Sequence, residues 1–89
     1  MSDADLRARI KEMLVKNLML QTTPDQIGDD LPLFGPNGLG LDSIDALEIV
    51  LELQRTFGVE ISDEQVGQRV LRSVETIVGF IETNREMAG

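Results

Sequence analysis

The chain has 89 residues, of which 42% are hydrophobic and 3% aromatic, and it contains no cysteine or histidine. This length predicts one small domain over residues 1–89, with a core of aliphatic side chains. Disulfides, thiolate metal sites and catalytic groups that need His or Cys are excluded. The formal charge of −8 argues against nucleic acid as a partner, because phosphates are bound through Lys and Arg.

The negative charge is concentrated in the middle of the chain. Residues 21–64 hold ten acidic residues and one basic residue, a sum of −9. Such a segment is either a solvated surface or a docking surface for basic partner proteins. No stretch reaches the roughly 20 apolar residues that span a bilayer, and the first ten residues carry charges where a signal peptide needs an apolar core. We therefore expect a cytoplasmic protein without membrane insertion.

A first helix is predicted from Ser2 or Asp3, either of which can cap it, to about Leu20. Apolar residues recur along it every four positions, as on the buried face of a helix. This stripe consists of Leu6, Ile10, Leu14 and Leu18, widened by Met13.

Thr22 to Leu41 is predicted to be a long loop, because proline and glycine recur throughout it. A short turn is expected at residues 25–27. The loop is too apolar for a disordered linker, so it is expected to pack on the helices. Calcium binding through Asp29, Asp30 and Asp42 is an alternative, but their spacing lacks the ladder of calcium-binding loops.

A second helix is predicted from about Ser43 to Thr56, ended by Gly58. Asp42 or Ser43 can cap it, and the glycines before it place Ser43 at an exposed corner, where free N–H groups and the helix dipole favour a phosphate. An inward face is formed by Ala46, Ile49, Val50, Leu53 and Phe57. A second apolar row, which spacing alone also assigns to the core, is formed by Ile44, Leu47 and Leu51.

Two further helices are predicted after an extended link at residues 59–61. Ser62 and Gln65 have the spacing of a capping box before a short helix over Asp63 to Arg69. Ser73 is predicted to cap the last helix, which should fray after Thr83. Its apolar face consists of Val74, Ile77, Val78 and Ile81. The fold class is therefore all-α, a bundle of three longer helices and one short helix.

The segment LDSIDALE at residues 41–48 resembles the D-S-[LI] motif of acyl carrier proteins, and FGVEISDE at residues 57–64, the acidity and the size strengthen the match. The resemblance implies a four-helix bundle of acyl-carrier type that has no catalytic activity. It also implies that 4′-phosphopantetheine from coenzyme A esterifies Ser43, and that its thiol carries acyl groups for fatty-acid, lipid or polyketide-type synthesis.

The resemblance also implies partners. These are a phosphopantetheinyl transferase, with Asp42 near its metal, and ketosynthases and other acyl-processing enzymes that have basic docking patches. Gln54 and Arg55 depart from the family, which often has acids there. A monomer is expected. The implied docking face combines apolar Ile44, Leu47 and Leu51 with acidic Asp42, Asp45, Glu48 and Glu52.

Other functions remain open at this point. An aminoacyl or peptidyl carrier is one, although Asp42 before the serine favours acyl cargo. An unmodified acidic adaptor for basic partners is another. An enzyme is disfavoured, because nothing in the sequence raises a pKa among the acids near Ser43. The aliphatic core could also open to admit an acyl chain, and the expected probes of that are Leu53, Val70 and Ile77.

Overall fold

The structure is a computed structural model that describes residues 3–61 and 63–88. It contains four α-helices and one short 3-10 helix in the described part of the chain. These are α1 (Asp3–Leu18), η1 (Pro24–Gln26), α2 (Ser43–Phe57), α3 (Glu64–Val70) and α4 (Val74–Ala88). The predicted all-α fold, with three longer helices and one short helix, is confirmed.

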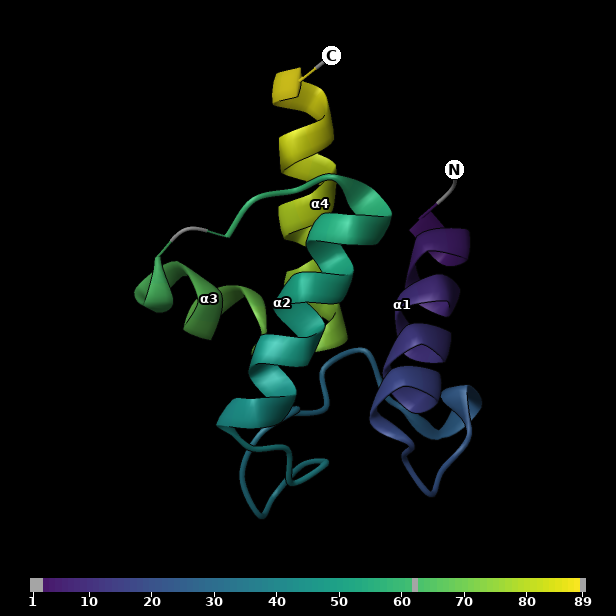
Figure 1. Cartoon of the computed structure of the whole chain (residues 1–89). Helices are drawn as coiled ribbons and strands as arrows, with labels where there is room; N and C mark the ends of the chain where they lie inside the picture. Colours follow the sequence, from purple (N-terminus) through teal and green to yellow (C-terminus); the bar gives the residue numbers. More distant parts are fainter. Residues whose placement is uncertain (1–2, 62, 89) are drawn as a thin grey trace.

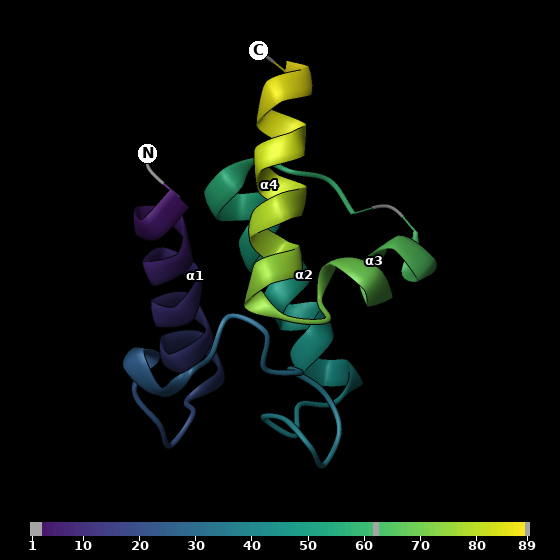
Figure 2. The same ribbon diagram turned by 180° about the vertical axis from the view of Figure 1, so that it is seen from behind.

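The three longer helices lie side by side, and α3 lies to one side of them (Figure 1). The helix α1 runs antiparallel to α2 and α4, so both ends of the chain lie at the same end of the bundle. The view from behind shows α4 in front of α2, with α1 beside both (Figure 2). The segment between α1 and α2 crosses the opposite end of the bundle, where α2 begins.

The predicted apolar faces of the longer helices meet in the core. Leu6, Ile10 and Leu14 of α1 are buried, as predicted, whereas Leu18 and Met13 are only partly buried. Burial of such side chains is the main favourable term in folding, at roughly 25 cal/mol per Å² of apolar surface. The other two long helices contribute Ile49, Leu53, Val74, Ile77, Val78 and Ile81.

The C-terminal ends of α1 and α4 differ from their predictions. α1 ends at Leu18 and not at Leu20, because Met19 adopts a left-handed conformation (φ 52°) and the N–H of Leu20 donates to the carbonyl of Val15 at 3.1 Å. The expected cap at Ser2 lies outside the described residues. α4 does not end at Thr83 but continues to Ala88, over residues with good helix propensity.

The caps of the other helices follow their sequences. Gly58 ends α2 with φ 68°, as predicted. Ser73 and Thr76 bond to each other's backbone N–H groups at the start of α4. α3 is shifted by one residue from its prediction, because Asp63 is its N-cap and accepts from the N–H of Gln65 at 2.7 Å. The predicted capping box falls on Ser62, which lies outside the described residues.

The loop between α1 and α2 packs on the bundle, as predicted, with buried Ile27, Leu33 and Leu41. The predicted turn is η1. Two backbone hydrogen bonds attach the loop to the turn and helix at the start of α4. The N–H of Leu33 donates to the carbonyl of Arg72 at 3.0 Å, and the N–H of Glu75 donates to the carbonyl of Asp29 at 2.9 Å.

An ion-pair cluster holds the same loop to α1 and α4. Lys11 Nζ lies 2.8 Å from Asp29 Oδ1, and Arg7 Nη1 lies 3.2 Å from Asp29 Oδ2. Arg7 also pairs with Asp3 and, through both of its terminal nitrogens, with Glu75. Asp29 is therefore engaged with cations of the chain, and the described residues contain no group of three or more acidic side chains placed to hold a metal ion. No helix in the described ranges has the length and apolarity needed to cross a membrane.

Candidate functional site

The first turn of α2 is fixed by Asp42. Asp42 Oδ1 accepts from the N–H groups of Ile44 and Asp45, both at 3.0 Å. Asp45 Oδ2 in turn accepts from the N–H of Asp42 at 3.1 Å, which completes a capping box. This arrangement satisfies N–H groups that would otherwise lack partners at the helix start. The expectation that these N–H groups remain free for a phosphate is therefore wrong for two of them, although the helix dipole remains.

Ser43 is the first residue of α2 and is exposed. Its hydroxyl has no hydrogen-bond partner within the described part of the chain, since its neighbour Asp42 takes the capping role. The other serine in that part, Ser73, is 5% exposed and bonds to Thr76. Ser43 thus presents a hydroxyl that a second protein can reach, on a backbone that the capping box holds in place.

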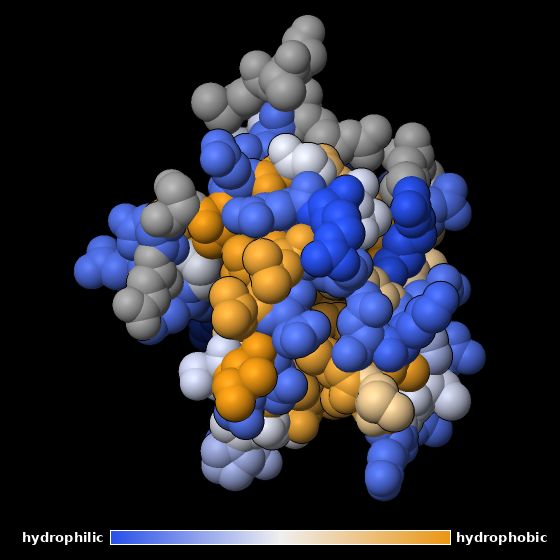
Figure 3. Space-filling view, in the orientation of Figure 1, coloured by the Kyte–Doolittle hydropathy of each residue, from blue (hydrophilic) through white to orange (hydrophobic). Residues whose placement is uncertain are grey.

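The second apolar row of α2 lies on the surface. Ile44, Leu47 and Leu51 are 70%, 59% and 44% exposed. The space-filling view shows apolar surface along α2 with hydrophilic surface beside it (Figure 3). Spacing alone assigned this row to the core, and that prediction is wrong. The exposure implied by the family resemblance is confirmed.

The acidic residues of α2 are less uniform than the predicted docking face. Glu48 is exposed, whereas Asp45 is partly buried and serves the capping box. Glu52 forms an ion pair with Arg55 at 3.1 Å, which offsets its charge. Glu48 and Glu52 line a narrow crevice between α2 and α1. Glu48 and Glu52 therefore lie on the edge of α2 that faces α1, whereas Asp42 lies on its other side.

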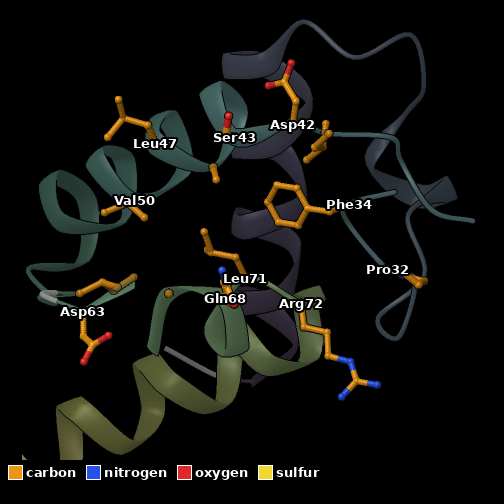
Figure 4. Close-up of a pocket in the computed structure, with 14 residues that line it drawn as sticks. Pro32, Phe34, Asp42, Ser43, Leu47, Val50, Asp63, Gln68, Leu71 and Arg72 are labelled. Carbon is orange, nitrogen blue, oxygen red and sulfur yellow. The ribbon is translucent and has the colours of Figure 1, made fainter. Parts of the chain in front are cut away.

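A cavity of about 720 Å³ lies on the other side of α2, between α2, α3 and the loop before α2. Ser43 and Asp42 belong to its lining, together with Leu47 of the exposed row. The close-up shows Phe34 of the loop and Leu71 after α3 reaching towards the space below α2 (Figure 4). The wall is mainly apolar and includes Phe34, Leu41, Ala46, Val50, Ile61 and Leu71.

Three polar residues of α3 and its ends also line this cavity. Gln68 lies next to Leu71 on the side that faces α2, whereas the side chains of Asp63 and Arg72 extend outward (Figure 4). None of these residues was predicted as part of the site. The sequence offered one signal for the cavity, which was the apolar character of the loop before α2, including Phe34. The expected probes of acyl entry, Leu53, Val70 and Ile77, are buried elsewhere and do not line the cavity.

The site fits a covalently attached arm. Ser43 offers an exposed and unbonded hydroxyl at the rim of a cavity whose apolar walls could shelter part of an attached chain. The geometry suits a residue that a partner modifies.

Comparison with known proteins agrees with this geometry. Residues 8–81 match the family model described as a phosphopantetheine attachment site. The acyl carrier protein of Solidesulfovibrio magneticus is 33% identical over 82 residues, covering 86% of this chain and 91% of that protein.

Two solved structures share the fold. The acyl carrier protein from Enterococcus faecalis has a TM-score of 0.74 at 30% identity, covering 94% of this chain and 99% of the other. A second match, with a TM-score of 0.71 at 26% identity, covers 88% of this chain and 97% of the other. It comes from the crystal structure of an engineered Bradyrhizobium japonicum glycine:[carrier protein] ligase complexed with carrier protein from Agrobacterium tumefaciens and ATP. The chain belongs to the acyl carrier protein family, whose members hold acyl groups on a phosphopantetheine arm.

Proposed function

We propose that Ser43 is the attachment residue for phosphopantetheine and that this chain is a single carrier domain, cytoplasmic and monomeric, without catalysis of its own. When bound, the arm supplies a thiol that holds acyl groups as thioesters. The observation that carries the proposal is the exposed, unbonded hydroxyl of Ser43 at the first position of α2, beside the cavity. Fatty-acid, lipid or polyketide-type synthesis is the proposed context.

Asp42 has a second role in this proposal. Its Oδ1 caps α2, while Oδ2 has no partner within the described residues. That oxygen is available to the metal of a phosphopantetheinyl transferase, a hard cation that prefers oxygen ligands. The transferase supplies the base that removes the Ser43 proton, so the carrier itself needs none.

Partner enzymes, including a ketosynthase, are proposed to dock on the exposed face of α2. The apolar row of Ile44, Leu47 and Leu51 would form the dry centre of the contact, with Asp45, Glu48 and Glu52 along its acidic edge. A small contact of this kind is steered by charge and releases readily, which a shuttle between enzymes requires. The cavity beside Ser43 would receive the apolar part of the cargo between transfers.

The attachment is tested by intact mass after incubation with coenzyme A, magnesium and a broad-specificity phosphopantetheinyl transferase. We expect a gain of one phosphopantetheine in the natural protein and in Ser62→Ala, a control for other serines. Ser43→Ala should gain none. Because Ser43 makes no side-chain bond and alanine favours helices, this variant should fold. Loading of Ser43→Ala would move the attachment to another residue, and no loading of the natural protein would favour the unmodified adaptor.

The docking face is tested by comparing two exposed apolar residues. Leu47→Asp places a charge in the proposed apolar row, whereas Met19→Asp places one directly after α1, outside that row. We expect Leu47→Asp to raise the KM of a ketosynthase for the loaded carrier and Met19→Asp to leave it unchanged. Equal effects of the two variants would show that α2 has no special part in docking.

An aminoacyl carrier is a second candidate, favoured by the structural match to the ligase complex. That complex contains a glycine:[carrier protein] ligase, a carrier protein and ATP. To separate the two candidates, the protein with phosphopantetheine attached and its thiol free is incubated with either an amino-acid ligase, its amino acid and ATP, or an acyl-transferring enzyme and its acyl donor. The mass of the product shows which cargo is accepted.

A further inference from the structure

Gln68 is a polar residue of the cavity lining whose side chain makes no contact that stabilises the fold through a hydrogen bond or an ion pair among the described residues. It lies on α3 and lines the cavity that also contains Ser43. The structure records no hydrogen bond to its amide from any described residue. Of the acidic liners, Asp42 caps α2 and Asp63 caps α3, each through Oδ1, and a carboxylate offers no donor. The guanidinium of Arg72 extends outward (Figure 4).

The chemistry of this amide is complementary to the arm. Phosphopantetheine contains two secondary amides, each with one N–H donor and one carbonyl acceptor. Gln68 offers the same pair of functions, with Nε2 as donor and Oε1 as acceptor. An arginine can only donate and an ionised carboxylate can only accept. Among the polar liners, Gln68 is therefore the one suited to pair with an amide in both directions.

The surroundings of Gln68 strengthen such a bond. Leu71 lies next to it, and Val50 and Leu47 lie across the cavity on α2 (Figure 4). Gln68 is exposed in the unmodified protein, but an arm that lies on the apolar walls would cover its amide, and a hydrogen bond shielded in this way contributes more than one at an open surface. The methyl and methylene groups of the arm would cover the same walls.

We propose that Gln68 positions the phosphopantetheine arm in the cavity by hydrogen bonding to one of its amides. This inference rests on attachment of the arm at Ser43. Because the bond is to the arm and not to the cargo, it acts on every cargo that the carrier holds. Gln68 is a positioning residue and takes no part in the attachment itself.

The test compares backbone amide NMR shifts between the unmodified and modified forms of each variant. The reporters are Ala46, Val50 and Leu71, which line the cavity. In the natural protein, modification should shift these reporters and the side-chain amide of Gln68. In Gln68→Leu, the shifts of the reporters should shrink by about threefold to tenfold, the factor that one net hydrogen bond contributes to a weakly populated docked state. Gln65→Leu, on the same short helix but outside the cavity lining, should match the natural protein.

Intact mass separates the possible failures. Gln68→Leu should be loaded as completely as the natural protein, since Gln68 is exposed and bonds to nothing that shapes Ser43. If neither the natural protein nor the variants are loaded, the attachment at Ser43 and the role of Gln68 are both refuted. If loading is complete but Gln68→Leu and Gln65→Leu give the same shifts, the inference alone is overturned. Gln68→Glu retains the shape without the donor, and full shifts in that variant would restrict the bond to the acceptor Oε1.

Discussion

Replacement of Asp42 separates its capping role from its proposed role with the transferase. Asp42→Ala removes an oxygen that accepts from two N–H groups at 3.0 Å. Loss of an N-cap acceptor costs about 0.5–2 kcal/mol, and loss of a negative charge at a helix start costs about 0.3–1 kcal/mol more. Asp42→Asn keeps an acceptor of similar capping strength and loses only the charge. We expect Asp42→Ala to be destabilised by about 1–2 kcal/mol and Asp42→Asn by less than about 1 kcal/mol.

Urea unfolding measures these free energies directly, and each kcal/mol lost should lower the Tm by about 4–8 °C in a domain of this size. The loading rate by a transferase, followed by intact mass, is measured on the same samples. Both variants should load slowly, because both lack the carboxylate proposed to face the metal. Equal destabilisation of the two variants would refute the hydrogen-bonded cap. Loading of Asp42→Asn at the natural rate would refute a metal role for the carboxylate.

Three further predictions concern stability. Met19→Gly should stabilise the protein by about 1 kcal/mol, because Met19 is 84% exposed and its left-handed conformation costs a side chain about 1–2 kcal/mol; an unchanged Tm would contradict this. The ammonium of Lys11 and then the guanidinium of Arg7 lower the pKa of Asp29, and Arg7 lowers the pKa of Glu75. The ionised carboxylates of Asp29 and Glu75 therefore stabilise the fold at a pH above their ordinary pKa values. This stabilisation is lost as the pH falls through their lowered pKa values in the folded protein. Arg7→Gln should lose less stability than the natural protein between pH 7 and pH 3, and an equal loss would show that the cluster contributes nothing. Leu53→Ala should cost about 2–5 kcal/mol in urea unfolding, because Leu53 is fully buried, and a loss below 1 kcal/mol would contradict its place in the core.

The helices and their core could be predicted because local rules decide them. The apolar residues that recur every four positions predicted the buried face of α1, and Gly58 predicted the end of α2. The ends of α1 and α4 were misjudged by local rules. Methionine does not favour a left-handed conformation, so the residue type at Met19 gave no signal that α1 ends there.

The candidate site was only partly predictable for a different reason. Ser43 and the exposed row of α2 followed from a motif within one segment. The cavity instead requires residues from the loop, α2 and α3 to meet, and no local pattern specifies that meeting. Gln68 in particular has an unremarkable sequence context, and its importance depends on the position of α3 opposite Ser43.

The attachment of the loop to the start of α4 has a mechanical consequence for cargo size. Phe34 and Pro32, on one wall of the cavity, flank Leu33, whose N–H is bonded to the carbonyl of Arg72. That wall therefore moves only with the junction between α3 and α4. The opposite boundary is α3, two turns long and set apart from the three longer helices (Figure 1). Short elements with few buried contacts open at the lowest free energy. We therefore expect the cavity to enlarge by displacement of α3, and hydrogen exchange in α3 should quicken as the carried chain lengthens.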